Sequence, residues 1–154
     1  ATARINGVGT DVAGNLTRGY LALKRIWHSG DAIVLNLPMP VARVKAHPAV
    51  LADAGRTALK RGPLVYCFEA ADNPGASSED LVLPPGARLT AAPREDLFGG
   101  VIGVSGVGNV IRTNWEHGRY GAEAGGRPTT VAAVPYYLWG NREEGKMLVW
   151  VRET

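Results

Sequence analysis

The stretch Arg61-Gly62-Pro63-Leu64-Val65-Tyr66-Cys67-Phe68-Glu69 decides the fold class of this chain. Its apolar and aromatic residues, from Leu64 onward, are typical of a β-strand, and Leu64, Tyr66 and Phe68 would share one face of that strand. Gly62-Pro63 breaks the pattern, and Arg56–Lys60 before it has the same extended character. The stretch therefore predicts two strand segments that meet at a turn.

Similar short segments follow one another along the rest of the chain. Asn6-Gly7 is a strong turn signal directly after a strand-like segment. Tyr20–Trp27 and Ala32–Leu37 flank the turn residues His28–Asp31 and together predict a β-hairpin. Pro48–Ala54 predicts a helical turn or a loop, and Gly108–Pro128 a long loop. Further extended segments are predicted over Val41–Ala46, Asp80–Leu83, Ala87–Ala91, Phe98–Val107, Thr130–Trp139 and Lys146–Arg152.

The frequent glycine and proline residues between short extended segments predict an all-β fold. The 154 residues include 20 Gly and 10 Pro, and no stretch of 12 or more residues keeps a helical stripe. We expect an antiparallel β-sandwich, jelly-roll or immunoglobulin-like, either as one sandwich or as one sandwich plus part of another. The polar loop Ala71–Asp80 predicts a boundary, with residues 1–70 in a first sandwich and residues 71–154 in a second. The alternative is that both parts pack as one unit.

Composition excludes several classes of partner and cofactor. The net charge is +3 and no run of five Lys or Arg occurs, so we expect no nucleic-acid partner. No apolar run reaches about 18 residues, which predicts no membrane partner. Cys67 is the only cysteine. It allows neither an intrachain disulfide nor a thiolate-rich zinc site, so no cofactor is predicted for this chain.

The candidate catalytic groups do not form a recognisable motif. Cys67 lies between two aromatic residues of an apolar strand and is expected to be buried and inert. The histidines stand singly, and glycoside hydrolysis would need two facing carboxyl groups. Glu69 is one available carboxylate, whereas Glu95-Asp96 and Glu143-Glu144 fall in expected turns. Gly103–Val107 resembles a nucleophile elbow but lacks the second outer glycine. No catalytic, metal-binding or cofactor-binding residue is therefore predicted.

Four aromatic residues are the remaining candidates for a binding surface. Trp and Tyr either pack in a core, anchor an interface between proteins or stack on sugar rings. Tyr137 and Trp139 would share one strand face, and Tyr136 would project from the other. We expect one of these faces to belong to the core. Tyr136, Tyr137, Trp139 and Trp115 are the predicted sugar or interface contacts.

An ordered set of short motifs resembles one enzyme family. The set includes Leu37-Pro38-Met39-Pro40-Val41, Arg61–Cys67, Gly99-Gly100-Val101, Pro135–Trp139 and Met147–Trp150. In this order and at these spacings it resembles the C-terminal part of glycoside hydrolase family 127, the β-L-arabinofuranosidase-like enzymes. The resemblance implies a parent enzyme that removes non-reducing-end arabinofuranose or a related sugar. It also implies a catalytic helical barrel, followed by β-sandwiches that support the barrel and contribute to dimerisation.

The family's site is implied to hold a cysteine nucleophile near a zinc ion bound by further cysteines and a glutamate. One cysteine, in a different motif, cannot supply that site, so the zinc is expected in the catalytic barrel. The leading hypothesis is a non-catalytic module whose partner is its own helical barrel, with a homodimer and arabinose-containing glycans as further expected partners. A stand-alone carbohydrate-binding module and a small independent hydrolase are the alternatives, and the sequence leaves the compartment open.

Overall fold

A computed structural model describes residues 1–112 and 125–153 of the chain. The described residues contain strands and short 3₁₀ turns but no α-helix, so the predicted all-β fold with antiparallel strands is confirmed. No helix among them is long and apolar enough to cross a bilayer. The chain divides into two compact units, Ala1–Met39 and Pro40–Thr154. The expected boundary between residues 70 and 71 falls inside the second unit, and the sandwich type stays a prediction.

The first unit is a small sheet with a two-stranded ribbon. The sheet has the order β2-β1-β5, and β3 pairs with β4. Asn6 and Gly7 both have positive φ, 51° and 81°, as a tight turn between β1 and β2 requires, so the predicted turn is confirmed. The strands of this unit are β1 (Thr2–Ile5), β2 (Val8–Thr10), β3 (Leu16–Thr17), β4 (Tyr20–Leu21) and β5 (Ile33–Asn36).

The predicted hairpin between Tyr20–Trp27 and Ala32–Leu37 is wrong. The turn at His28–Asp31 forms, but β5 pairs antiparallel with β1, and β4 pairs with β3. The physical reason is the side chain of Asn6. It donates to Asp31 Oδ1 at 2.7 Å and accepts from the Ala32 N–H at 2.9 Å. These two hydrogen bonds hold the end of β1 beside the start of β5.

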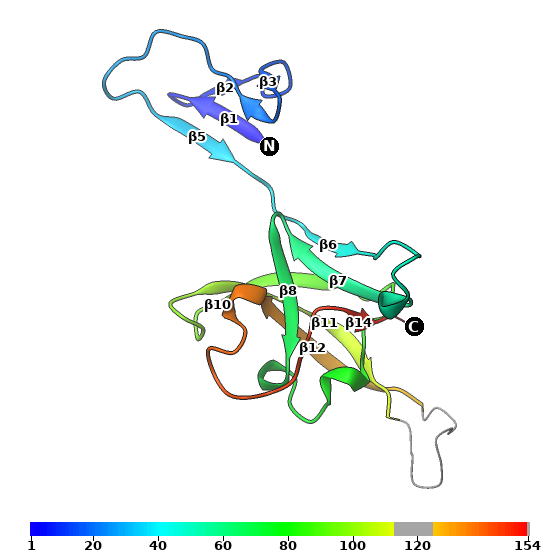
Figure 1. Ribbon diagram of the computed structural model, residues 1–154. Coiled ribbons are helices and arrows are strands. Elements are labelled where there is room, and N and C mark those ends of the chain that lie inside the picture. The colour runs from blue at the N-terminus through cyan, green and yellow to red at the C-terminus, as the bar shows by residue number, and fades with distance from the viewer. Residues whose placement is uncertain (113–124, 154) are drawn as a thin grey trace, which may run out of the picture. The chain divides into compact units, whose positions relative to one another are not determined.

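The described residues of the second unit form the nine remaining strands. Figure 1 draws them in colours from cyan to red. The element order is β6 (Val41–Val44), η1 (Leu51–Asp53), β7 (Arg56–Arg61), β8 (Leu64–Glu69), η2 (Ala70–Asp72), η3 (Ser78–Asp80), β9 (Leu81–Val82), β10 (Leu89–Arg94), β11 (Val101–Val110), β12 (Arg127–Pro135), η4 (Tyr136–Leu138), β13 (Met147–Leu148) and β14 (Val151–Arg152).

These elements confirm most of the predicted segments of this unit, with three differences. The predicted loop Gly108–Pro128 is shorter than expected, because β11 continues to Val110 and β12 begins at Arg127, and its middle lies outside the described residues. The segment predicted as Thr130–Trp139 is a strand only as far as Pro135, which has no N–H for the ladder, and it continues as η4. The predicted strand Lys146–Arg152 is two short strands, β13 and β14, which pair with different neighbours.

The strand pairings of this unit close into a circuit. β7 pairs with β8, β8 with β12, β12 with β11, β11 with β9, β9 with β14, and β14 again with β7. Five of these six pairings are antiparallel, and β9–β14 is parallel. The buried residues of the main core come from these strands or directly follow them: Leu59, Tyr66, Phe68, Leu81, Leu83, Val104, Val110, Val131, Ala133 and Val151. The circuit therefore surrounds the main core.

Strand β8 is buried on both faces from Tyr66 to Glu69, which suits its largely apolar sequence. Tyr66 and Phe68 lie in the main core, as their predicted shared face requires. Cys67, on the opposite face, packs with Leu97 and Val134 in a second cluster, so its predicted burial is confirmed. Because side chains alternate along a strand, Glu69 leaves β8 on the same face as Cys67.

The glycine directly after the failed nucleophile-elbow motif has a packing role. A Cβ atom on Gly108 would lie 2.6 Å from the Val82 carbonyl oxygen and 2.7 Å from Val131 Cγ1. Gly108 thus permits β11 to approach its neighbours closely.

Candidate functional site

A buried ion cluster joins three segments that are far apart in the sequence. Glu69 ends β8, Asp72 lies in η2, and Arg142 follows η4. The Arg142 guanidinium donates to both carboxylate oxygens of Asp72, from Nη1 at 2.9 Å and from Nη2 at 2.6 Å. Nη2 also contacts Glu69 Oε2. The Glu69 and Asp72 side chains are only 7% and 2% exposed, so the cation compensates two carboxylates that are withdrawn from water.

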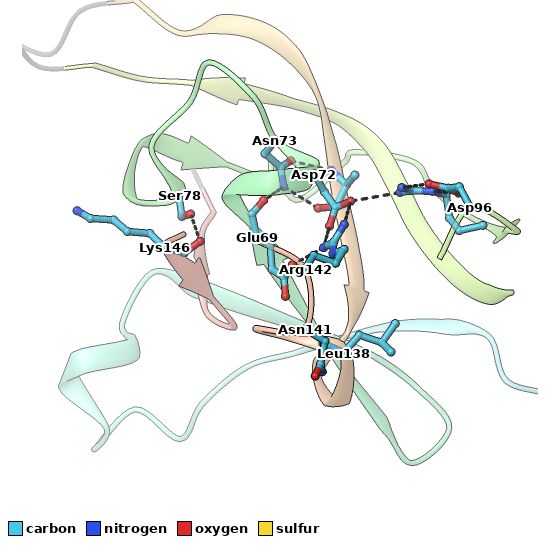
Figure 2. Close-up of polar contacts among 11 residues, drawn as sticks. Glu69, Asp72, Asn73, Ser78, Asp96, Leu138, Asn141, Arg142 and Lys146 are labelled. Carbon is cyan, nitrogen blue, oxygen red and sulfur yellow. Dashed lines mark hydrogen bonds and ion pairs between the residues drawn. The ribbon is translucent and has the colours of Figure 1, made fainter. Parts of the chain in front are cut away.

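The cluster continues toward β10 through a second arginine. Arg94 Nη1 lies 3.4 Å from Asp72 Oδ1, and Arg94 also forms a two-point contact with Asp96 at 2.8 and 2.7 Å. Figure 2 shows Arg142 beside Asp72, with Asp96 on another side of Asp72. The hydrogen bonds that Arg142 donates to Asp72, and then those it donates to Glu69, raise the pKa of Arg142 above its ordinary value. Arg142 therefore remains charged at any pH at which the protein is folded.

Asn73 fixes the segment that carries Asp72. Its Nδ2 donates to the Glu69 carbonyl at 2.8 Å and to the Ala132 carbonyl at 2.9 Å, and its Oδ1 accepts from the Ala132 N–H at 2.9 Å. The side chain is thus bonded to β8 and β12 at once, and Asn73 is buried. These bonds set the position of η2, and with it the position of the Asp72 carboxylate.

A pocket of about 380 Å³ lies beside this cluster. One wall is formed by Glu69–Ala71, and the other by the loop that connects η4 to β13. We call it the loop pocket. Its lining residues are Glu69, Ala70, Ala71, Trp139, Gly140, Arg142, Glu143, Glu144, Gly145 and Lys146.

Of the predicted aromatic contact residues that the structure describes, only Trp139 lines the loop pocket. Trp139 lines it with 46% of the residue exposed, and Tyr136 lies beside Trp139 with ring centroids 6.1 Å apart and planes tilted by 31°. Tyr137 is exposed but does not line the pocket. Trp115 lies outside the described residues. Leu138, rather than an aromatic residue, is the buried side chain of η4, and the sugar or interface role of the aromatics stays a prediction.

The described groups do not form a hydrolytic or metal-binding constellation. Glu69 and Asp72 approach the same guanidinium rather than facing each other across a cleft, and Asp72 does not line the loop pocket. Burial, assisted by the charges of Glu69 and Asp72, raises the pKa of Cys67 to about 12, so it is an inert thiol at neutral pH. Within residues 1–112 and 125–153, no three His, Cys, Asp or Glu side chains gather as metal ligands would.

Sequence reasoning missed the ion cluster. The predictions weighed Glu69 but gave no role to Asp72, Asn73, Arg94 or Arg142. The partners lie up to 73 residues apart, and neither helical nor strand periodicity links them. The one available signal was that Glu69 ends a strongly apolar strand, where a carboxylate needs a compensating cation.

Comparison with known proteins assigns this architecture. Over 152 residues the chain is 37% identical to a non-reducing end β-L-arabinofuranosidase of Bifidobacterium longum subsp. longum, covering 94% of the chain and 23% of that enzyme. A crystal structure of a GH127 β-L-arabinofuranosidase from Geobacillus stearothermophilus T6 matches with a TM-score of 0.86 and 41% identity, over 99% of the chain and 24% of that structure. A second GH127 β-arabinofuranosidase structure matches with the same TM-score at 27% identity, over 99% of the chain and 23% of that structure.

The chain thus spans about a quarter of the length of these relatives. The model of the glycoside hydrolase family 127 C-terminal domain matches residues 41–152, which is nearly the whole second unit. The chain therefore belongs to glycoside hydrolase family 127 and carries that family's C-terminal domain.

Proposed function

We propose that this chain is a non-catalytic module of a β-L-arabinofuranosidase-like enzyme and that it supports the enzyme's catalytic barrel. In this proposal the parent acts on non-reducing-end β-L-arabinofuranosides, as the names of its relatives suggest. Any zinc of the parent belongs to the barrel, because the single thiol here is buried and protonated.

The observation that carries the proposal is the exposure of strand β5. Its residues Ile33, Val34 and Leu35 are 52%, 60% and 50% exposed, although successive side chains point to opposite faces of the sheet. A strand that is apolar on both faces is typical of a sheet covered on both sides. Ala3 is the only buried residue among positions 1–39, so the first unit lacks a core of its own. The remainder of the enzyme would supply that cover.

The ion cluster supports the non-catalytic part of the proposal. An acid–base pair for glycoside hydrolysis needs two carboxyl groups with room for a sugar between them. Glu69 and Asp72 instead share one arginine inside the fold. A carbohydrate-binding role remains the second candidate, and the exposed Trp139 at the loop pocket favours it. Exposed aromatic residues of η4 would equally suit a contact between two copies of the enzyme.

Reconstitution in two pieces tests the supporting role. The preceding catalytic part of the parent is expressed alone, and the present chain is added in trans. We expect a complex by size-exclusion chromatography with light scattering, and increased hydrolysis of 4-nitrophenyl β-L-arabinofuranoside. Leu35→Glu should weaken the complex, because it places a charge on the apolar strand. Thr17→Glu, at an exposed polar position of β3, is the control. Activity and mass that do not change when the chain is added would refute the proposal.

A further inference from the structure

We propose that the loop pocket binds the hydroxyl groups of a single sugar ring, so that the module carries an accessory sugar site. The choice of an arabinose unit as ligand rests on the proposed function. The preference for a hydroxylated ligand rests on the pocket alone.

Two buried polar atoms of residues that line the loop pocket lack partners within the described chain. These are Glu69 Oε1, an acceptor, and Arg142 Nε, a donor. A buried polar atom without a hydrogen bond costs roughly 1–3 kcal/mol, so such atoms usually meet a ligand or a water molecule. Both belong to the same ion pair, and both residues line the loop pocket. One bound group could therefore reach both after a small adjustment of the pair.

The chemistry of this pair selects the ligand class. A carboxylate oxygen accepts hydrogen bonds and a guanidinium Nε–H donates one, whereas a hydroxyl group does both. A cation would satisfy only Glu69 and would be repelled by Arg142. An anion would satisfy only Arg142 and would be repelled by Glu69. A neutral polyol is the class that suits both atoms.

The rim of the loop pocket supplies an aromatic surface and further polar groups. Trp139 is half exposed there, and an indole face stacks on the C–H face of a sugar ring. Glu143, Glu144 and Lys146 are exposed around the opening and offer acceptors and donors to the outer hydroxyls. A volume of about 380 Å³ lies at the small end of ligand sites, which suits one ring rather than an oligosaccharide.

Titration of the isotopically labelled chain, residues 1–154, tests the site by NMR. The probes are methyl β-L-arabinofuranoside, L-arabinose, ammonium chloride and sodium sulfate. We expect both sugars to shift the Trp139 indole N–H and the Gly145 amide with a Kd on the order of 1 mM, and the salts to leave them unmoved. The Trp27 indole, which lies outside the pocket, reports non-specific effects.

Two variants locate the binding. Trp139→Ala should weaken sugar binding about tenfold, and Trp27→Ala, an equally exposed tryptophan in the first unit, should leave it unchanged. If Trp139→Ala alters the spectrum as a whole, Glu144→Gln replaces it and should weaken binding severalfold with the fold retained.

The opposite results are equally definite. If Arg142 Nε pairs directly with Glu69 Oε1, no ligand is needed, and neither sugar will shift the pocket resonances at 100-fold the expected Kd, on the order of 0.1 M. That result would overturn the site, as would equal shifts with the salts. This failure differs from failure of the proposed function. A chain that binds no sugar but still increases hydrolysis by the catalytic part keeps its supporting role.

Discussion

Arg142→Met should be the most damaging single substitution in the ion cluster. Methionine keeps much of the side chain's apolar stem but removes the cation that Asp72 and Glu69 share. Both carboxylates are more than nine-tenths buried, and Arg94 reaches only one of them, at 3.4 Å. Breaking a buried ion pair by removing one partner costs about 3–5 kcal/mol, because the remaining charge stays uncompensated.

Denaturant unfolding followed by tryptophan fluorescence measures this loss. We expect the free energy of unfolding to fall by about 3–5 kcal/mol at an unchanged m-value, which is a large part of the stability of an ordinary domain. The melting temperature should fall by more than 6 °C, since each 1 kcal/mol shifts it by roughly 2–4 °C in a domain of this size.

Two further variants check the cause of the loss. Arg88→Met removes an exposed arginine from the same unit and should change the stability by less than about 0.5 kcal/mol. Adding Glu69→Gln and Asp72→Asn to Arg142→Met should recover part of the loss, because the uncompensated charges are gone. A loss below about 1 kcal/mol for Arg142→Met, or no recovery in the triple variant, would refute the electrostatic reasoning.

Three further predictions concern residues that pack in or beside the core. Tyr66→Phe should lower the free energy of unfolding by about 1–2 kcal/mol in urea unfolding, because the Tyr66 hydroxyl donates to the partly buried carbonyl of Ile102 at 2.7 Å. Gly108→Ala should cost about 1–3 kcal/mol in the same assay, since its new Cβ would meet the Val82 carbonyl at 2.6 Å. Cys67 should react with a thiol reagent only after unfolding. Because burial raises its pKa to about 12 in the folded chain, the unfolded thiol ionises first, and stability should fall as the pH rises above about 9.

Each of these expectations has its own control. Gly86→Ala adds a Cβ that meets nothing within 4 Å and should be nearly neutral, so equal losses at Gly86 and Gly108 would contradict the packing argument. In the Cys67→Ala variant, the free energy of unfolding should fall less above about pH 9 than in the unmodified chain. Labelling of Cys67 in native buffer at the rate seen in guanidinium would show that the thiol is not buried. A Tyr66→Phe variant as stable as the parent would mean that water replaces the phenol at Ile102.

Local sequence chemistry predicted most single elements correctly. Asn6-Gly7 specifies a tight turn through its positive φ angles, and Gly62-Pro63 separates β7 from β8. Leu64, Tyr66 and Phe68 were predicted to share one face of β8, and all three lie in or against the main core. These features depend on residues that are close in the sequence, so pattern reasoning can reach them.

Pairing between strands could not be predicted in the same way. The hairpin expected around His28–Asp31 has good local turn chemistry, yet the Asn6 side chain joins Asp31 and Ala32 and directs β5 to β1 instead. The bond joins residues 25 positions apart, a separation for which strand alternation gives no signal. Long-range polar contacts of this kind decide the topology after local preferences have made the strands.

The candidate site was only partly predictable. Trp139 and Glu69 stood out by residue type, but their nearness at the loop pocket comes from the path of the chain after η4. Arg142 carries no local pattern that separates it from a solvated arginine. Its importance follows from the two buried carboxylates that it contacts, and sequence spacing does not show them.

The closed circuit of the second unit has a consequence for how this domain is made. Strand β14 joins β7 to β9, although both were synthesised much earlier, and its Val151 is fully buried in the main core. Until β14 has left the ribosome, β7 and β9 expose unpaired edges that could pair with neighbouring nascent chains. Completion of the core thus waits for the last strand of the domain. Chaperone demand during synthesis should be greatest in the interval before Val151 emerges.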